Sequence, residues 1–380
     1  MPFKKRSLKI HKKNKGKIEI KLKMKLKTMD DLSLAYTPGV AAVSLAVAKN
    51  KKESYEMTNR ANQIAIVSDG TAVLGLGDIG PEGAMPVMEG KSAIFKEFAN
   101  VDAIPLCINT KDTDEIVKFC KQIEPSFGGI NLEDISAPRC FEILDRLEKD
   151  LNIPVFHDDQ DGTAIVTLAA LINSCRVSGK VLKELSVVVS GAGAAGLAIT
   201  RLLIAEGVKD IVLLDSKGSI YKGRKDLNKY KKEIAEKTNK MKYKGDLAGA
   251  LIGADVFIGV SQPNLLTKNM IAEMAENPFI FAMANPHPEI LPKLAIEGGA
   301  FIVGTGRSDF PNQVNNALVF PGLFRGLLDS GAKKVTQKMK ISASIALAYS
   351  VKKPTKTNIL PKVTDKNAVK AIANAINKKK

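Results

Sequence analysis

The sequence is poor in the residues that build cysteine-, histidine- or tryptophan-based sites. Its 380 residues include four cysteines, three histidines and no tryptophan. The cysteines are Cys107, Cys120, Cys140 and Cys175, and their spacing forms no C-x-x-C pair. This argues against a zinc ribbon or a disulfide framework and favours reduced thiols in a cytoplasmic protein. Three histidines cannot build a His-rich metal site in one chain without other ligands.

Long apolar runs are also missing. No stretch approaches the roughly 18 consecutive apolar residues of a membrane helix, and the basic N-terminus lacks the apolar centre of a secretory signal. We therefore expect no membrane span. The apolar content of 45% and the charged content of 26% are ordinary for a globular protein, and the length predicts two domains.

Basic charge is concentrated at the N-terminus. The formal net charge is +17, and residues 1–28 contain twelve Lys and Arg against one Glu. Such an arm could bind nucleic acid, but no aromatic side chains interleave with the lysines as they do in single-strand binders. We favour a solvated basic surface that docks through scattered apolar residues, and a positive field that attracts a small anionic substrate. The apolar residues are Leu8, Ile10, Ile18, Ile20 and Leu22.

Short apolar runs alternate with helical patterns in two successive series. The strands expected in the first series are 64–68, 102–108, 128–132 and 153–156, and a helix is expected from about Pro86 to Phe98. The strands expected in the second series are 185–190, 211–214, 256–260, 279–284 and 301–304. Strands separated by helices indicate βαβ units and parallel sheets.

We therefore predict an α/β protein of two domains. An N-terminal α/β substrate and metal domain is expected at 1–160, with a basic arm at 1–28. A Rossmann-like dinucleotide-binding domain is expected at 161–325. Residues 326–380 are expected to form a helical C-terminal segment.

A glycine-rich turn supplies the first candidate site. The segment Gly191–Gly196 follows an apolar strand and opens a helix, and Asp215 ends the next strand nineteen residues later. This context is typical of a dinucleotide site, in which the glycines admit a pyrophosphate to the helix N-terminus. Asp215 would bind the ribose hydroxyls and favour NAD, whereas Lys217 could attract the 2′-phosphate of NADP. The cofactor-binding candidates are Gly191, Ala192, Gly193, Ala194, Ala195, Gly196, Asp215 and Ser261.

Two other segments imitate nucleotide motifs. Residues 75–80 also fit G-x-G-x-x-G, but Pro81 follows at once and no acid ends a strand at the required distance. We interpret this segment as a structural or substrate-loop turn. Gly90-Lys91-Ser92 imitates the end of a phosphate-binding loop, but Met85 stands where its first glycine belongs.

Carboxylates follow two neighbouring strands of the first series. Glu133 and Asp134 follow one, and Asp158 and Asp159 follow the next. The ends of parallel strands face one crevice, where converging carboxylates need a cation, and oxygen ligands favour Mg²⁺ or Mn²⁺. The alternative is that these acids cap helices. Lys91, if buried beside them, is a candidate general base, since burial lowers the pKa of a lysine; spacing alone equally allows a surface lysine.

Seven segments, taken together and in order, resemble the short bacterial form of the malic enzymes. They are residues 34–41, 88–92, 131–135, 156–160, 191–196, 284–286 and 306–317. The resemblance implies oxidative decarboxylation of L-malate to pyruvate and CO₂ with NAD or NADP. It also implies a C-terminal segment that packs back on the first domain and a homodimer or larger homo-oligomer, for which the N-terminal arm suits exchange between subunits.

The resemblance assigns roles to the candidate residues. Lys91, assisted by Asp158, would take the malate hydroxyl proton, and Tyr36 would protonate C3 of the enol. From the residues alone, Tyr36 is equally a half-buried loop aromatic. The implied ligands of Mg²⁺ or Mn²⁺ are Glu133, Asp134 and Asp159. The residues implied to bind the substrate are Lys91, Asn285, Asn315 and Asn316.

The sequence departs from the family pattern at two positions. Ala72 stands where larger malic enzymes have a carboxylate-binding arginine, so we expect backbone N–H groups after Thr37-Pro38 to hold the substrate carboxylate. Asp161 stands where many short forms have histidine. Two alternatives stay open. One is a malolactic enzyme that forms L-lactate, and the other is a basic nucleic-acid-binding or scaffold protein on an inactive enzyme fold.

Overall fold

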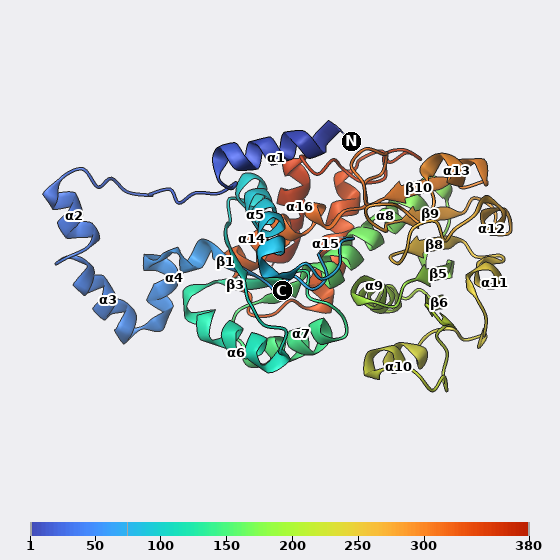
Figure 1. Ribbon diagram of the computed structural model, residues 1–380, viewed down its shortest axis with the longest axis horizontal. Helices are drawn as coiled ribbons and strands as arrows, with labels where there is room; N and C mark the ends of the chain where they lie inside the picture. Colours follow the sequence, from blue (N-terminus) through green and yellow to red (C-terminus); the bar gives the residue numbers. More distant parts are fainter. Residues whose placement is uncertain (1, 74, 379–380) are drawn as a thin grey trace.

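The computed structural model describes residues 2–73 and 75–378, and two helix-covered sheets form its main body (Figure 1). The first sheet is wholly parallel, in the order β2-β1-β3-β4. Its strands are β1 (Gln63–Ser68), β2 (Asp102–Cys107), β3 (Gly129–Leu132) and β4 (Val155–His157). All four confirm the expected strands to within two residues. The helices between them are α5 (Gly80–Ala99), α6 (Thr113–Ile123) and α7 (Arg139–Asp150).

Helix α5 begins earlier than expected. The apolar pattern predicts a start near Pro86, but the helix begins at Gly80 and Pro81 occupies its first turn. Proline suits that turn because its missing N–H has no partner there. Pro86 instead lies inside the helix.

The second sheet has the order β10-β9-β8-β5-β6-β7, in which only β7 is antiparallel to its neighbour. Its strands are β5 (Ser186–Ser190), β6 (Asp210–Asp215), β7 (Gly218–Ser219), β8 (Val256–Gly259), β9 (Phe279–Ala282) and β10 (Ile302–Thr305). Its helices are α8 (Thr163–Ser178), α9 (Ala194–Ala205), α10 (Lys229–Ala235), α11 (Leu247–Leu251), α12 (Lys268–Ala272) and α13 (Pro292–Glu297). The order reverses at β5, so its carboxyl end is the switch point where such sheets bind ligands.

The C-terminal segment packs back on the first unit, as expected. It contains α14 (Phe320–Ser330), α15 (Gln337–Ser350) and α16 (Lys366–Asn377). The ring centroids of Phe95 on α5 and Phe320 on α14 lie 4.6 Å apart. Gly326 lets α14 approach α16, since a Cβ there would lie 2.6 Å from the Cβ of Ile376. Helix α15 lies along α8, where the Asn173 amide donates to two backbone carbonyls of the segment at 2.7 Å each.

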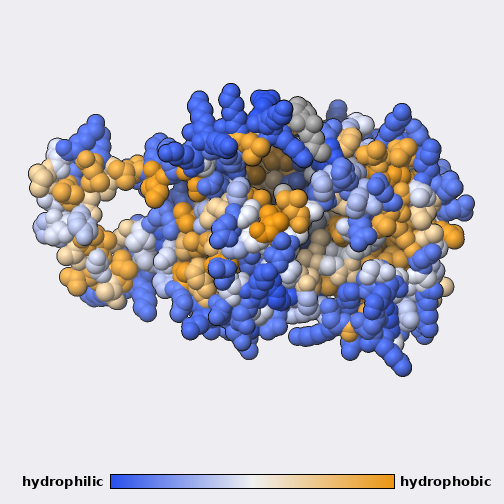
Figure 2. Space-filling view, viewed as in Figure 1, coloured by the Kyte–Doolittle hydropathy of each residue, from blue (hydrophilic) through white to orange (hydrophobic). Residues whose placement is uncertain are grey.

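The N-terminal residues form an arm outside this body. Its helices are α1 (Pro2–Asn14), α2 (Met29–Ala35), α3 (Val40–Lys49) and α4 (Ser54–Met57). Helix α1 lies over the body, and the chain then runs out to α2 and α3, which project to the left in Figure 1. Neither α2 nor α3 contains a buried residue, and apolar side chains cover this projection in Figure 2.

By length and composition alone, residues 29–49 form a segment apolar enough to cross a membrane, with mean hydropathy 1.3 and no buried part. However, a turn at 37–39 divides the segment into helices of 7 and 10 residues. A spanning helix needs about 20 residues, so we assign no span here. Exposed apolar faces of this kind are typical of interaction sites.

Candidate active site

Lys91 is buried among acids at the carboxyl edge of the first sheet. It lies on α5, and its Nζ is 2.6 Å from Glu133 Oε2 and in direct contact with Asp158 Oδ2. All three side chains are buried. The ring of Phe320 covers the ammonium, with its centroid 4.4 Å from Nζ. The interpretation of Lys91 as a surface lysine is therefore wrong.

The expected lowering of the pKa of Lys91 is also wrong. Burial does disfavour the ammonium, but the adjacent Asp158 and Glu133 carboxylates outweigh burial and raise the pKa of Lys91 above its ordinary value. For the acids, burial dominates and raises the pKa of Asp158 and of Glu133 to about 7 each. Lys91 is thus a strong base in direct contact with Asp158, an acid whose pKa is about 7.

Three carboxylates beside this pair could hold a cation. Oxygens of Glu133, Asp134 and Asp159 all lie within 4.8 Å of one another. The N–H of Asp134 donates to Asp159 Oδ2 at 2.9 Å, which fixes the two loops relative to each other. No side chain caps α7 or α8, so the helix-cap alternative for these acids is not supported. Glu133 and Asp134 are buried and Asp159 is partly exposed, and this all-oxygen donor set fits Mg²⁺ or Mn²⁺.

We expect Mn²⁺ alone to raise the melting temperature, because it binds only the folded arrangement of these carboxylates. Burial raises the pKa of Glu133 to about 7 and that of Asp159 to about 6, and the metal needs both ionised. Affinity should therefore fall as the pH drops through these values. Differential scanning fluorimetry on Asp159→Asn should show no Mn²⁺-dependent rise. Asp114→Asn, at an exposed carboxylate on α6, should behave as wild type; an equal rise in both variants would contradict this assignment.

Asp161 is neutralised by the C-terminal segment. It lies in the π-helical turn η4 (Asp158–Gly162), and Lys340 of α15 places Nζ 2.7 Å from its Oδ2. The two side chains are only 10% and 14% exposed. The negative charge that Asp161 places beside the cation cluster is thus offset by a cation from α15.

Lys340→Met should lower the free energy of unfolding by about 3–5 kcal/mol, because it leaves a buried carboxylate without its partner. Urea denaturation followed by circular dichroism measures this loss. The double variant Asp161→Asn/Lys340→Met should recover most of it, since neither charge remains. A double variant no more stable than Lys340→Met would show that lost packing, and not charge, causes the effect.

The glycine turn has the geometry of a dinucleotide site. Gly191 has a φ of +113°, and a Cβ there would lie 2.7 Å from the carbonyl oxygen of Val260. A Cβ at Gly196 would lie 1.7 Å from the Gly191 carbonyl oxygen, so only glycine fits at either position. Ser261 adjoins the turn, with its Oγ 3.2 Å from that of Ser190. Helix α9, which the turn opens, packs against η4 and so lies beside the acids.

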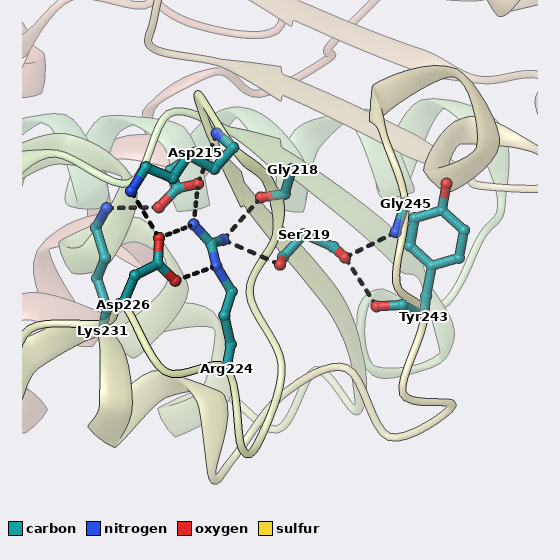
Figure 3. A network of polar contacts seen from close by, with 9 residues as sticks. Asp215, Gly218, Ser219, Arg224, Asp226, Lys231, Tyr243 and Gly245 are labelled. Atoms are coloured by element: carbon teal, nitrogen blue, oxygen red, sulfur yellow. Dashed lines mark hydrogen bonds and ion pairs between the residues drawn. The ribbon is translucent and has the colours of Figure 1, made fainter.

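Asp215 is held by two cations that the sequence analysis missed (Figure 3). Its Oδ1 lies 2.8 Å from Arg224 Nη2, and its Oδ2 lies 2.6 Å from Lys231 Nζ. The side chain of Lys217 pairs instead with Asp226, at 3.0 Å. Both oxygens of Asp215 are therefore occupied, and the carboxylate is neutralised. The only sequence signal for these two cations is the basic stretch at 223–246, whose composition does not distinguish a solvated surface from a contact with Asp215.

Of the three candidate substrate amides, Asn316 lies beside the acids, whereas Asn285 and Asn315 meet at Gly306. Asn316 adjoins η4, since a Cβ on Gly162 would lie 3.1 Å from its Cβ. Asn315 donates to the Gly306 carbonyl at 3.4 Å, and Asn285 Nδ2 lies 2.9 Å from the Cβ position of the same glycine. Asn285 also meets the first glycine of the 75–80 turn, whose Cβ would lie 2.0 Å from the Asn285 carbonyl oxygen.

Tyr36 is not brought to this site. It ends α2 in the projecting arm and is 67% exposed. The expectation that N–H groups after Thr37-Pro38 bind the substrate carboxylate is wrong, because they are already used. Gly39, Val40 and Ala41 donate to backbone carbonyls within the arm, at 2.8, 2.7 and 3.2 Å.

Two family models together match most of the chain. The malic enzyme N-terminal domain matches residues 14–148, and the malic enzyme NAD binding domain matches residues 160–380. The chain belongs to the malic enzyme family. This confirms the resemblance of the seven segments and the two-unit α/β fold with a Rossmann-like part. The family's curated relatives include enzymes named NAD- or NADP-dependent malic enzymes.

Similarity to individual malic enzymes extends over the whole chain. A bifunctional malic/malolactic enzyme of Bacillus subtilis is 52% identical and covers 100% of this chain and 93% of the relative. An NAD-dependent malic enzyme of Geobacillus stearothermophilus is 52% identical over 95% of this chain and 76% of its own. The solved NAD-dependent malic enzyme of Thermotoga maritima superposes with a TM-score of 0.95 at 49% identity, over 98% of this chain and 99% of that one.

Proposed function

We propose that the protein converts L-malate to pyruvate and CO₂ with reduction of NAD or NADP, in a reaction that depends on a divalent cation. The observation that carries the proposal is the placement of Lys91 against Asp158 and Glu133. That pair lies beside an oxygen-rich cation cluster and beside the helix that the glycine turn opens. A base, a cation site and a hydride acceptor site thus lie next to one another.

Two side chains of this protein, Lys91 and Asp158, carry out the proton transfer. Neutral Lys91 takes the proton of the malate C2 hydroxyl as hydride leaves C2, and passes it to Asp158. Asp158 is the acceptor in contact with Lys91 Nζ, and burial raises its pKa to about 7, so it takes up a proton more readily than an ordinary carboxylate. Mg²⁺ or Mn²⁺ on Glu133, Asp134 and Asp159 would supply Lewis acidity at the C2 oxygen and offset the carboxylates that keep Lys91 protonated. Asn285, Asn315 and Asn316 orient the substrate.

A single assay tests the proposal. Purified protein is incubated with L-malate, Mn²⁺ and either NAD or NADP, the reduced cofactor is followed optically, and products are separated by chromatography. Reduced cofactor and pyruvate in equal amounts, both abolished by EDTA, are the expected result. Absence of product with either cofactor would overturn the proposal.

A malolactic reaction is the second candidate, because the 52% identical Bacillus subtilis relative is named a bifunctional malic/malolactic enzyme. Such a reaction would return the hydride to pyruvate before release. The same assay distinguishes the two: L-lactate without accumulated reduced cofactor would support malolactic activity.

We also propose a homodimer in which the arm of each copy covers the other. Helices α2 and α3 bury none of their residues against the body of their own chain. Even apolar side chains of these helices are exposed: Leu34 is 65% exposed and Leu45 is 72% exposed. Tyr36 lies in this arm, outside the acid cluster of its own chain. The site is therefore complete only if a second copy supplies its Tyr36.

Cofactor choice follows from the neutralised Asp215. We propose that NADP is accepted as well as NAD, because Arg224 and Lys231 cancel the repulsion between Asp215 and a 2′-phosphate. Lys231→Met should lower kcat/KM for NADP by about 10-fold, the equivalent of one charged hydrogen bond, and leave that for NAD unchanged or higher. Steady-state kinetics with both cofactors measure the ratio. Lys225→Met, at an exposed lysine nearby, is the control; equal losses for the two cofactors in Lys231→Met would refute this account.

A further inference from the structure

We propose that Glu289 is a positioning residue that ties the loop after β8, which carries Ser261, to the loop after β9, which carries Asn285. The proposal rests on the function proposed above, with Asn285 binding the substrate and Ser261 binding the cofactor as the sequence predicts. The Glu289 carboxylate binds both loops, so it fixes the distance between the Ser261 loop and the Asn285 loop.

The carboxylate of Glu289 bridges the two loops directly. Glu289 is 0% exposed. Its Oε1 accepts the N–H of Ser261 and its Oε2 accepts the N–H of Ala284, each at 3.1 Å. Strands β8 and β9 are parallel neighbours, so their carboxyl ends and the loops that follow lie at the same edge of the sheet. Ala284 directly precedes Asn285, and Ser261 adjoins the glycine turn.

The Glu289 carboxylate is buried in a space that requires glycine at position 259, and burying its charge is unfavourable. A Cβ on Gly259, the last residue of β8, would lie 2.3 Å from Glu289 Cδ, so glycine is needed there. Within residues 2–73 and 75–378, no basic side chain pairs with Glu289. Burial raises its pKa, and only backbone N–H groups oppose that effect. An apolar side chain would fill the space at lower cost, so the bridge itself is what the carboxylate contributes.

Backbone contacts extend the same connection. The N–H of Leu266 donates to the Glu289 carbonyl at 3.1 Å, and the N–H of Asn264 donates to the Pro288 carbonyl at 3.2 Å. The chain after β8 is thus attached at several points to the segment that follows Asn285. We expect a displacement of the Ser261 loop to move Asn285 through this attachment.

Glu289→Gln tests the proposal, because glutamine keeps the shape but turns one acceptor oxygen into an NH₂ that faces a backbone N–H donor. We expect the Kd for NADH, measured by fluorescence without malate, and the KM for malate each to rise about 10-fold, with kcat changed less. Glu289→Asp keeps the charge but is too short to reach both donors, and should raise both constants as well. Glu297→Gln, at an exposed carboxylate on α13, is the control.

The outcomes separate this role from a merely structural one. A structural role would lower the urea midpoint of Glu289→Gln and leave the NADH Kd and malate KM of the folded protein unchanged. Values within twofold of wild type in both variants would overturn the proposal. If Glu289→Gln does not fold, Glu289→Asp decides. If the wild type binds NADH but yields no product from malate, the proposed function fails, and the NADH Kd alone decides the inference.

Discussion

Replacing Lys91 by methionine should lower kcat with L-malate by about 10²–10⁴-fold, the usual contribution of a positioned general base. Methionine fills the space under the Phe320 ring but carries no proton acceptor. The Glu133 and Asp158 carboxylates, whose pKa values are already about 7, can take up protons and remain buried without the ammonium. The folded protein should therefore survive, and kcat measured at saturating Mn²⁺ and NAD reports the lost proton transfer.

Two further variants make the interpretation specific. Lys91→Arg keeps the positive charge but cannot act as a base, because guanidinium does not deprotonate in proteins, and we expect it to be as inactive as Lys91→Met. Lys96→Met removes an exposed lysine from the same helix, where it pairs with Asp102 at 2.7 Å, and should retain wild-type kcat. An active Lys91→Arg would show that the charge matters and that another group is the base.

Hybrid dimers should regain activity that both parent variants lack. Tyr36→Phe and Lys91→Met each carry one defect in every site and are expected to be inactive as homodimers. If the arm is exchanged, a hybrid of the two has one site with both native residues and one site with neither. Such hybrids, co-expressed with two different tags and purified through both, should show about half the activity of a wild-type dimer.

The opposite arrangement gives a clear contrary result. If each chain supplied its own Tyr36, every site of the hybrid would carry one defect, and its activity would stay at the level of the parents. Light scattering on the same preparation checks that a dimer was assayed. A monomer with full activity would contradict the exchanged arm altogether.

The sequence predicted the features that depend on local pattern. Strand periodicity located β1 to β6 and β8 to β10, and the glycine turn was identified because its neighbouring strand, helix and acid all lie within about 30 residues, the length of one βαβ unit. The carboxylates were placed at one edge because parallel strands end together. Lys91, however, was distinguished from a surface lysine only by family resemblance, since nothing local marks it as buried.

The errors share a cause, which is contact between residues distant in the sequence. The pKa shift of Lys91 was predicted in the wrong direction. That direction depends on Glu133 and Asp158, which come close to Lys91 only in the folded chain. Arg224 and Lys231 were missed because a basic stretch has the same composition whether it faces water or one carboxylate. The N–H groups after Pro38 were assigned to substrate because their internal partners cannot be inferred without the backbone path.

The contribution of the C-terminal helices to the site has a consequence for synthesis. The acids at 133–161 obtain the Phe320 ring over Lys91 from α14 and the Lys340 cation from α15, both late in the chain. When the ribosome has synthesised all strands of the first sheet, α14 and α15 have not yet been made. The acid cluster then lacks both the Phe320 ring and the Lys340 cation. The nascent protein must keep this acidic edge solvated until α15 has left the exit tunnel, so catalytic competence arises after, and not during, the folding of the domain that holds its base.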